Sequence, residues 1–222
     1  MGEQTCLAGG VGVGADKVDL KRLPPYRARA GRLDLVDVPP SRYLAIDGAG
    51  DPNTTPAFTE AVGTLYPLAY ALKFRSKAAG RDYVVPPLEG LWWADDMDAF
   101  TVARDKARWQ WTLLLLVPDW LDDSDVEAAR ETLVVTGRAP ARLDDVRVEA
   151  LEEGRCVQTL HVGSFDDEAE VLERIHHQHV PSHGLRLAGR HHEIYLSDVR
   201  RVEPARRRTI LRQPVVQRCD PG

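Results

Sequence analysis

The sequence predicts an α+β domain in which a β-β-α-β-β module occurs twice, related by a pseudo-two-fold axis, with a ligand cleft between the halves. Two observations indicate this. Segments that alternate polar and apolar residues, as half-buried strands do, flank segments with helical periodicity. The same order returns about 114 residues later, where "RYLAIDGAG" (42–50) and "CVQTLHVGS" (156–164) occupy matching places. We expect one domain at 21–222, with repeats at about 30–120 and 140–216.

The first repeat opens with two strands, "RLDLVDV" (32–38) and "RYLAIDG" (42–48), on either side of a proline turn. A helix is predicted from about Pro56 to Ala79, because apolar residues recur there every three or four positions. Pro67 lies inside this segment and is expected to kink or interrupt the helix.

Two strands and a second helix complete the first repeat. The strands are "LEGLWWA" (88–94) and "WQWTLLLLV" (109–117). The helix is "DDSDVEAARETLVVTG" (122–137), for which Ser124 is the expected N-cap because its hydroxyl can accept from a free backbone amide.

The second repeat follows the same order. Its first two strands are "DVRVEALEEG" (145–154) and "RCVQTLHVGSF" (155–165), and "DDEAEVLERIHHQHV" (166–180) is an amphipathic helix. The strands "HHEIYLSD" (191–198) and "RRTILRQPVV" (207–216) end the repeat. Each helix is expected to cover one face of its half-sheet and to leave the other face open toward the cleft.

Composition narrows the classes of function. The net charge of −5 argues against a nucleic-acid-binding surface, which usually carries an excess of Lys and Arg. Cys6, Cys156 and Cys219 are widely spaced and form no C-x-x-C motif, which predicts no disulfide framework and fits a reducing cytoplasm. The longest apolar run is too short to span a membrane. The glycine-rich residues 1–20 are expected to form a disordered lead-in.

Strand alternation singles out one carboxylate. In "HHEIYLSD", His191, Glu193 and Tyr195 share one face of the strand. Ile194 and Leu196 take the other face and are expected to pack under the helix. Glu193 and Tyr195 should therefore look out from the open face into the cleft.

Aromatic residues are expected around this carboxylate. The same alternation places Tyr43 toward the cleft, and of the neighbouring Trp92 and Trp93 we favour Trp92. Trp109 and Trp111 share one face of the next strand. Tryptophans are most often core residues, whereas several on one side of a cleft form a wall that suits planar hydrophobic ligands. A carboxylate in such a cleft can pair with a cationic ligand or act as a general base.

The histidines are interpreted as scaffold. All seven lie between residues 161 and 192, and His176 and His179 have the spacing that would let them share a metal. No H-E-x-x-H motif is present, and His191 and His192 point to opposite faces of their strand. We therefore expect no metal site and no cofactor.

Three segments together resemble the GyrI-like small-molecule-binding family: "LYPLAYALK" (65–73), "DYVVPPLEGLWW" (82–93) and "GRHHEIYLSDVRRVEPARRRTILRQPV" (189–215). They are most similar to a stand-alone bacterial subgroup of hydrolases that open the cyclopropane ring of DNA alkylators of the yatakemycin and duocarmycin type. The resemblance implies a duplicated module with a ligand cleft. Other members are effector-binding domains of transcription regulators, but this chain shows no helix-turn-helix segment.

The resemblance also implies roles for particular residues. Glu193 would support the attack of water on the strained ring, and Tyr195, Tyr66 or Tyr83 would donate to the carbonyl oxygen on which charge develops. The expected substrate-binding residues are Tyr43, Tyr66, Tyr83, Trp92, Trp111 and His176. The expected partner is a planar aromatic small molecule, with no direct contact to nucleic acid or membrane. One alternative is a non-catalytic protein that binds or sequesters drugs in the same cleft, and another, which the acidic net charge permits, is a partner-binding protein of the gyrase-inhibitor kind.

Overall fold

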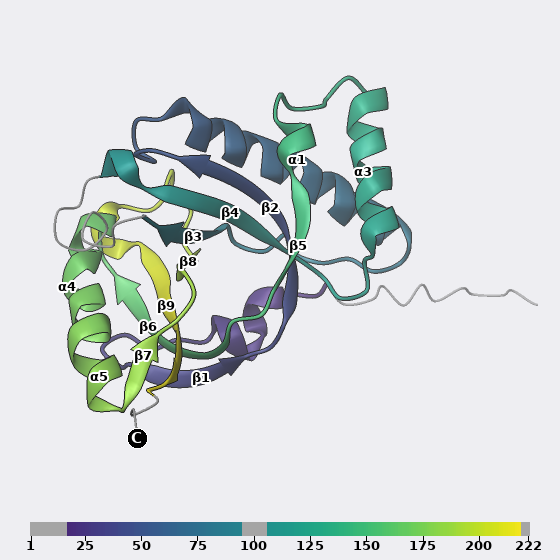
Figure 1. Cartoon of the computed structure of the whole chain (residues 1–222). Coiled ribbons are helices and arrows are strands. Elements are labelled where there is room, and N and C mark those ends of the chain that lie inside the picture. The colour runs from purple at the N-terminus through teal and green to yellow at the C-terminus, as the bar shows by residue number, and fades with distance from the viewer. Residues whose placement is uncertain (1–16, 95–105, 219–222) are drawn as a thin grey trace, which may run out of the picture.

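The computed structural model describes residues 17–94 and 106–218, and it confirms the predicted α+β class (Figure 1). Nine strands form one sheet in which every pairing is antiparallel. The strands are β1 (Asp34–Val38), β2 (Ser41–Ala49), β3 (Glu89–Trp93), β4 (Gln110–Val117), β5 (Arg147–Leu151), β6 (Gly154–Val162), β7 (Leu185–Leu187), β8 (His191–Tyr195) and β9 (Arg208–Gln217).

The helices begin and end close to the predicted residues. The helix α1 (Pro56–Ala78) continues through Pro67. For α3 (Asp123–Val135), the predicted cap Ser124 is wrong: Asp122 is the N-cap, because its side chain accepts from the backbone amide of Asp125. The helical segment of the second repeat consists of α4 (Glu168–Glu173), a π-helical turn (Arg174–His179) and α5 (Val180–Ser182).

The N-terminal lead-in lies mostly outside the described residues, which begin at residue 17. Val18 forms a β-bridge with Tyr83, and Leu20 is buried in the main core. The folded part of the chain therefore starts before residue 21. Among the described residues, no helix combines the length and the apolar character needed to cross a bilayer.

The two repeats exchange their first strands. The strand order is β1-β6-β9-β8-β3-β4-β2-β5, so the consecutive strands β1 and β2 do not pair with each other. Instead β1 pairs with β6 of the second repeat, and β5 pairs with β2 of the first. The two halves meet where β3 pairs with β8. Local sequence patterns predicted the order of elements along the chain but not this exchange.

The register is symmetric about the pair formed by Gly90 and Glu193. Pairing partners on neighbouring strands form one row across the sheet, and these partners point to the same face. The row consists of Ile46, Leu113, Gly90, Glu193, Leu211 and Thr159.

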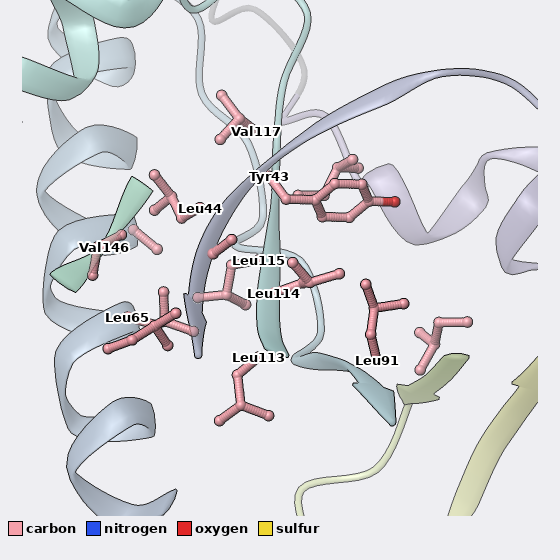
Figure 2. Close-up of a cluster of buried hydrophobic side chains, with 14 of the residues drawn as sticks. Tyr43, Leu44, Leu65, Leu91, Leu113, Leu114, Leu115, Val117 and Val146 are labelled. Carbon is pink, nitrogen blue, oxygen red and sulfur yellow. The ribbon is translucent and has the colours of Figure 1, made fainter. Parts of the chain in front are cut away.

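Helix α1 packs on the face to which this row points, here called the helix face. Figure 2 shows Leu44 of β2 facing Leu65 of α1, whereas Tyr43 points to the opposite side. In the second repeat, Ile175 of the π-helical turn clusters with Val157 of β6 on the same face. Glu193 therefore lies on the helix face and not on an open face, which corrects the predicted arrangement. The two helical segments cover β2 and β6 and leave β3 and β8 uncovered between them.

The opposite face, here called the reverse face, is also closed. Ile194, expected to pack under a helix, lies on the reverse face, in line with its register partners Glu89 and Ile210. The chain before β1 covers this face, where Tyr26 is buried. Burial on both faces explains why apolar residues in the central strands could not identify the helix side.

A buried ionic network lies on the reverse face. His192 is at its centre, with Nε2 2.9 Å from Glu89 Oε2 and Nδ1 3.0 Å from Glu153 Oε1. Arg212 donates to Glu153 Oε2 at 2.8 Å, and the Tyr26 hydroxyl donates to Glu89 Oε1 at 2.5 Å. Each buried charge thus has a partner of opposite sign, which burial requires.

The network changes the titration of its members. Burial disfavours the charged imidazole, but the nearby carboxylates of Glu153 and Glu89 outweigh it and raise the pKa of His192 to about 9. Burial opposes ionisation of Glu153 as well, but His192 and Arg212 lower the pKa of this carboxyl group to about 2. At neutral pH, His192 is therefore a cation beside the Glu153 anion.

We expect this network to make stability depend on pH. The ordinary pKa of histidine is 6.5, so the stabilisation by protonated His192 is complete below about pH 6.5 and is lost as pH rises to about 9. The full loss is about 3 kcal/mol in the free energy of unfolding. Urea denaturation of the wild type between pH 6 and pH 9.5 measures it.

The variant His192→Gln removes the titrating group and keeps a hydrogen-bond donor, so it should flatten this pH dependence. The exposed His177 provides the control: His177→Gln should keep the wild-type slope. An unchanged slope in His192→Gln would contradict the assignment.

Candidate functional site

A cleft of about 980 Å³ lies on the helix face, bounded by α1, by the central strands and by α4. Its floor is the part of β3 and β8 that neither helical segment covers. The aromatic residues of its lining are Phe58, Tyr66, Tyr70, Trp92, Trp109, Phe165 and Tyr195. Phe58 stacks on Trp92 with ring centroids 6.2 Å apart, and Trp109 meets Trp92 edge to face at 5.8 Å. These rings form a wall suited to a flat apolar ligand.

Glu193 lies at the floor of the cleft in a chain of hydrogen bonds. The Tyr195 hydroxyl donates to Glu193 Oε2 at 2.8 Å, and Trp92 Nε1 donates to the same hydroxyl at 3.0 Å. An indole N–H can only donate, so the single proton of the Tyr195 hydroxyl is directed to the carboxylate. Glu193 is 9% exposed and still lines the cleft. The site is thus a nearly buried carboxylate with one oxygen fixed in place.

The geometry makes Tyr195 a partner of Glu193 rather than a donor to a ligand. Burial, followed by the charge of Glu193, raises the pKa of the Tyr195 hydroxyl well above 10. This hydroxyl therefore stays protonated at neutral pH. Its proton is engaged by Glu193, so it does not serve a ligand oxygen at the same time.

His191 approaches the other oxygen of the carboxylate. Its side chain is fully buried, with Nε2 3.6 Å from Glu193 Oε1. The ring of His176 packs behind it at a centroid distance of 6.4 Å. Burial, followed by the proximity of His191, lowers the pKa of His176 to about 4, so His176 is neutral at pH 7.

A second carboxylate lines the cleft. Glu168, in the first turn of α4, is buried and contributes to the wall opposite α1. Its charge also raises the pKa of Tyr195. Sequence reasoning did not identify Glu168, because the predicted helix begins with several acidic residues and periodicity alone does not show which of them faces a cleft. Phe58, Trp109 and Phe165 were not singled out as site residues either, because periodicity shows which residues share a face but not which face borders the cleft.

Gly90 leaves the space that the side chains of Trp92 and Tyr195 occupy. It pairs with Glu193 across the centre of the sheet. A Cβ atom at this position would lie 2.7 Å from Trp92 Nε1 and 3.1 Å from the Tyr195 hydroxyl. The Trp92–Tyr195–Glu193 chain therefore requires a residue without a side chain here.

The structure brings together four of the eight residues singled out from the sequence. Glu193, Tyr195, Tyr66 and Trp92 line the cleft. The other four lie outside its lining and are buried; they are Tyr43, Tyr83, Trp111 and His176.

Each of these four has a physical reason for its place, and that of His176 is its packing against the ring of His191. Tyr43 points to the reverse face of the sheet, whereas the cleft lies on the helix face. Tyr83 packs edge to face on Trp120. Trp111 is on the helix face but fills the space above Gly48 and is covered by Phe58.

Within the described residues, no group of three or more His, Cys, Asp or Glu side chains is arranged to hold a metal ion.

Comparisons with known proteins identify the family. Residues 119–215 match the model of the GyrI-like small molecule binding domain. The solved structure of an uncharacterized conserved protein from Listeria innocua is 34% identical, with a TM-score of 0.81 over 90% of this chain and 100% of that protein. The chain belongs to the GyrI-like family. No curated protein sequence matches it.

Two further structures place this GyrI-like chain among its relatives. One, described as a hydrolase from Listeria innocua, is 34% identical with a TM-score of 0.78, over 90% of this chain and 100% of that one. The C-terminal domain of EcmrR has a TM-score of 0.53 at 13% identity, over 84% of this chain and 98% of that domain. At this identity, EcmrR shares the fold alone.

The substitution Gly90→Ala should disrupt the site of this GyrI-like domain. The added methyl group displaces Trp92 and Tyr195, and overpacking of this kind costs about 1–3 kcal/mol in the free energy of unfolding. Urea denaturation measures the loss, and near-ultraviolet circular dichroism reports the movement of the aromatic rings.

Gly63→Ala is the matched control, because no atom lies within 4 Å of the added Cβ on α1. Alanine there should stabilise the helix by about 0.5–1 kcal/mol. Equal stability of wild type and Gly90→Ala would show that the close approach is not needed.

Proposed function

We propose that this GyrI-like protein is a hydrolase that adds water to a planar, hydrophobic substrate, with Glu193 as general base. The observation that carries the proposal is a nearly buried carboxylate, held by Tyr195, on the floor of an aromatic cleft. The similarity to the Listeria innocua protein described as a hydrolase supports it. A cleft of this size and lining suits a ligand that is flat and mostly apolar.

The geometry suits general-base catalysis. Tyr195 holds Oε2, so a water molecule that enters from the cleft meets the remaining lone pairs of the carboxylate. Glu193 would take a proton from this water as its oxygen attacks carbon. A positioned general base contributes about 10²–10⁴-fold to the rate. Release of strain in the substrate lowers the activation barrier further, so the protein has to lower it by less.

The substrate we propose is a cyclopropane fused to a cyclohexadienone, as in genotoxic natural products of the yatakemycin and duocarmycin type. Water forms a C–O bond to a ring carbon, a cyclopropane C–C bond breaks, and its electron pair passes through the ring to the carbonyl oxygen. Glu193 accepts one proton from water and then releases it to solvent, while the phenolate oxygen formed from the carbonyl takes up one proton from solvent and becomes a neutral phenol, so the net change is the addition of one water. Opening the ring removes the alkylating centre, so the reaction detoxifies the compound.

Tyr66 is the hydroxyl we assign to the developing oxyanion. It lines the cleft on α1, and burial raises the pKa of its hydroxyl, which therefore remains a donor at neutral pH. The Tyr195 hydroxyl is engaged by Glu193.

Glu193→Gln should lower kcat/KM by about 10²–10⁴-fold, because the amide cannot accept the proton from water. The assay follows the gain of one water mass by the substrate. Binding of the intact compound should change little, since the amide keeps the size of the side chain.

The exposed Glu127 on α3 supplies the control: Glu127→Gln should retain wild-type turnover. No gain of water by the wild type above background, or full activity in Glu193→Gln, would overturn the proposal.

A second candidate function is sequestration without chemistry. Two buried carboxylates, Glu193 and Glu168, line one aromatic cleft, and this charge suits a planar cation. Tight binding of a cationic aromatic dye, with a cyclopropane compound recovered unchanged after hours, would favour this function over hydrolysis.

A further inference from the structure

The proton that Glu193 takes from water has to leave before the next turnover. The carboxylate is only 9% exposed, and it lines the cleft. The Tyr195 hydroxyl already donates to Oε2, so the new proton is held on Oε1. A flat apolar product in the cleft excludes water from that side. A route that does not pass through the cleft would release the proton while the product is still bound.

Two buried histidines lie next to Oε1. His191 Nε2 is 3.6 Å from Glu193 Oε1, and the side chain of His191 is fully buried. The ring of His176 meets the ring of His191 edge to face, with centroids 6.4 Å apart. Neither histidine belongs to the lining of the cleft. A single bridging water is enough to pass a proton between groups at such separations.

His176 has a buried nitrogen that can accept a proton. The amide group of Gln213 donates to the backbone oxygens of Ala188 at 2.9 Å and Pro214 at 3.2 Å, so its own oxygen remains to accept from His176. Nε2 of His176 has no hydrogen-bond partner among the described residues, so Nδ1 carries the hydrogen that Gln213 accepts. In the neutral ring, Nε2 is therefore a buried lone pair, which is costly to leave unsatisfied without a use.

The chain reaches solvent one residue further on. His176 and His177 lie in the π-helical turn Arg174–His179, a kind of turn that is frequent at functional sites. Their rings meet edge to face at 6.3 Å, and the side chain of His177 is 58% exposed. Three imidazole rings thus form a row from Glu193 to solvent, here called the histidine row: His191, His176 and His177.

We infer that the histidine row carries the proton of Glu193 to solvent. Glu193 gives up the proton from Oε1 to His191, which passes one on to Nε2 of His176. His177 and the surrounding water receive it. Each imidazole takes up one proton and gives up one proton per turnover, so no charge stays in the core and Glu193 becomes a carboxylate again. The inference rests on the proposed function for the source of the proton.

Kinetics with the cyclopropane compound can separate the chemical step from the loss of the proton. The side chain in His176→Gln can still donate to Gln213 but cannot carry a proton. With protein in excess over substrate, its first turnover should stay within about twofold of the wild-type rate, because His176 does not line the cleft. With substrate in excess, kcat should fall about tenfold or more. Product should then appear as a burst of one equivalent per protein.

Chemical rescue distinguishes proton transfer from a structural role. The substitution His176→Ala leaves a cavity that a small ring can enter. Added imidazole should restore kcat, whereas pyrrole, a ring of the same size without a basic nitrogen, should not. The control His183→Gln changes an exposed histidine whose Nδ1 contacts the backbone oxygen of His179, and it should keep the wild-type kcat without a burst.

Hydrogen exchange tests the route without any hydrolysis. Nuclear magnetic resonance of protein with isotope-labelled histidine follows the exchange of the His191 ring hydrogen with water. This exchange should be about tenfold slower in His176→Gln than in the wild type, and His183→Gln should leave it unchanged.

Three results would overturn the histidine row: no burst in His176→Gln, equal rescue by imidazole and pyrrole, or exchange at His191 that does not depend on His176. Each of them would leave hydrolysis by the wild type in place. A wild type that adds no water to the compound, but shows the exchange that depends on His176, would refute the proposed function and keep the proton route.

Discussion

The pairing of β3 with β8 is the interaction on which the rest of the structure depends. It joins the two halves of the sheet, and its register decides what each face contains. On the helix face it sets Gly90 beside Glu193, which leaves room for Trp92 and Tyr195. On the reverse face it brings Glu89 to His192. A slip of one residue would exchange the faces of every side chain in the strand, and Glu193 would then be buried among other carboxylates.

The two faces of β8 therefore carry different arrangements of polar side chains. The reverse face holds charges that are fully compensated and sealed from water. The helix face holds a carboxylate that is fixed by one hydroxyl and otherwise meets the cleft. The network occupies the reverse face of the strand, while the cleft side remains available to a ligand. This division explains why adjacent histidines and a glutamate occur in so short a segment.

Much of the fold was predictable because the signals are local. The extent of α1, the alternation in "HHEIYLSD" and the order of the two repeats all come from periodicity within a few residues. The side of the sheet on which the cleft lies was not predictable, since it depends on where helices pack over strands distant in sequence. The site shows the same division. Glu193 stood out as a carboxylate on one face of a strand whose other face carries Ile194 and Leu196, whereas Glu168 and the ionic partners Glu89 and Glu153 become recognisable only when distant segments are brought together.

The exchange of first strands makes each half of the sheet depend on the other repeat. Neither repeat contains a complete half-sheet, so one repeat alone could build the same sheet only by pairing with a second copy as an intertwined homodimer. In such a dimer the residues at the symmetry axis face their own copies, and a glutamate there would lie directly opposite a second glutamate, a destabilising pair of like charges. In a single chain the two positions can differ. A glycine on one central strand and a glutamate on the other, as Gly90 and Glu193 are here, form an asymmetric pair that no homodimer can encode.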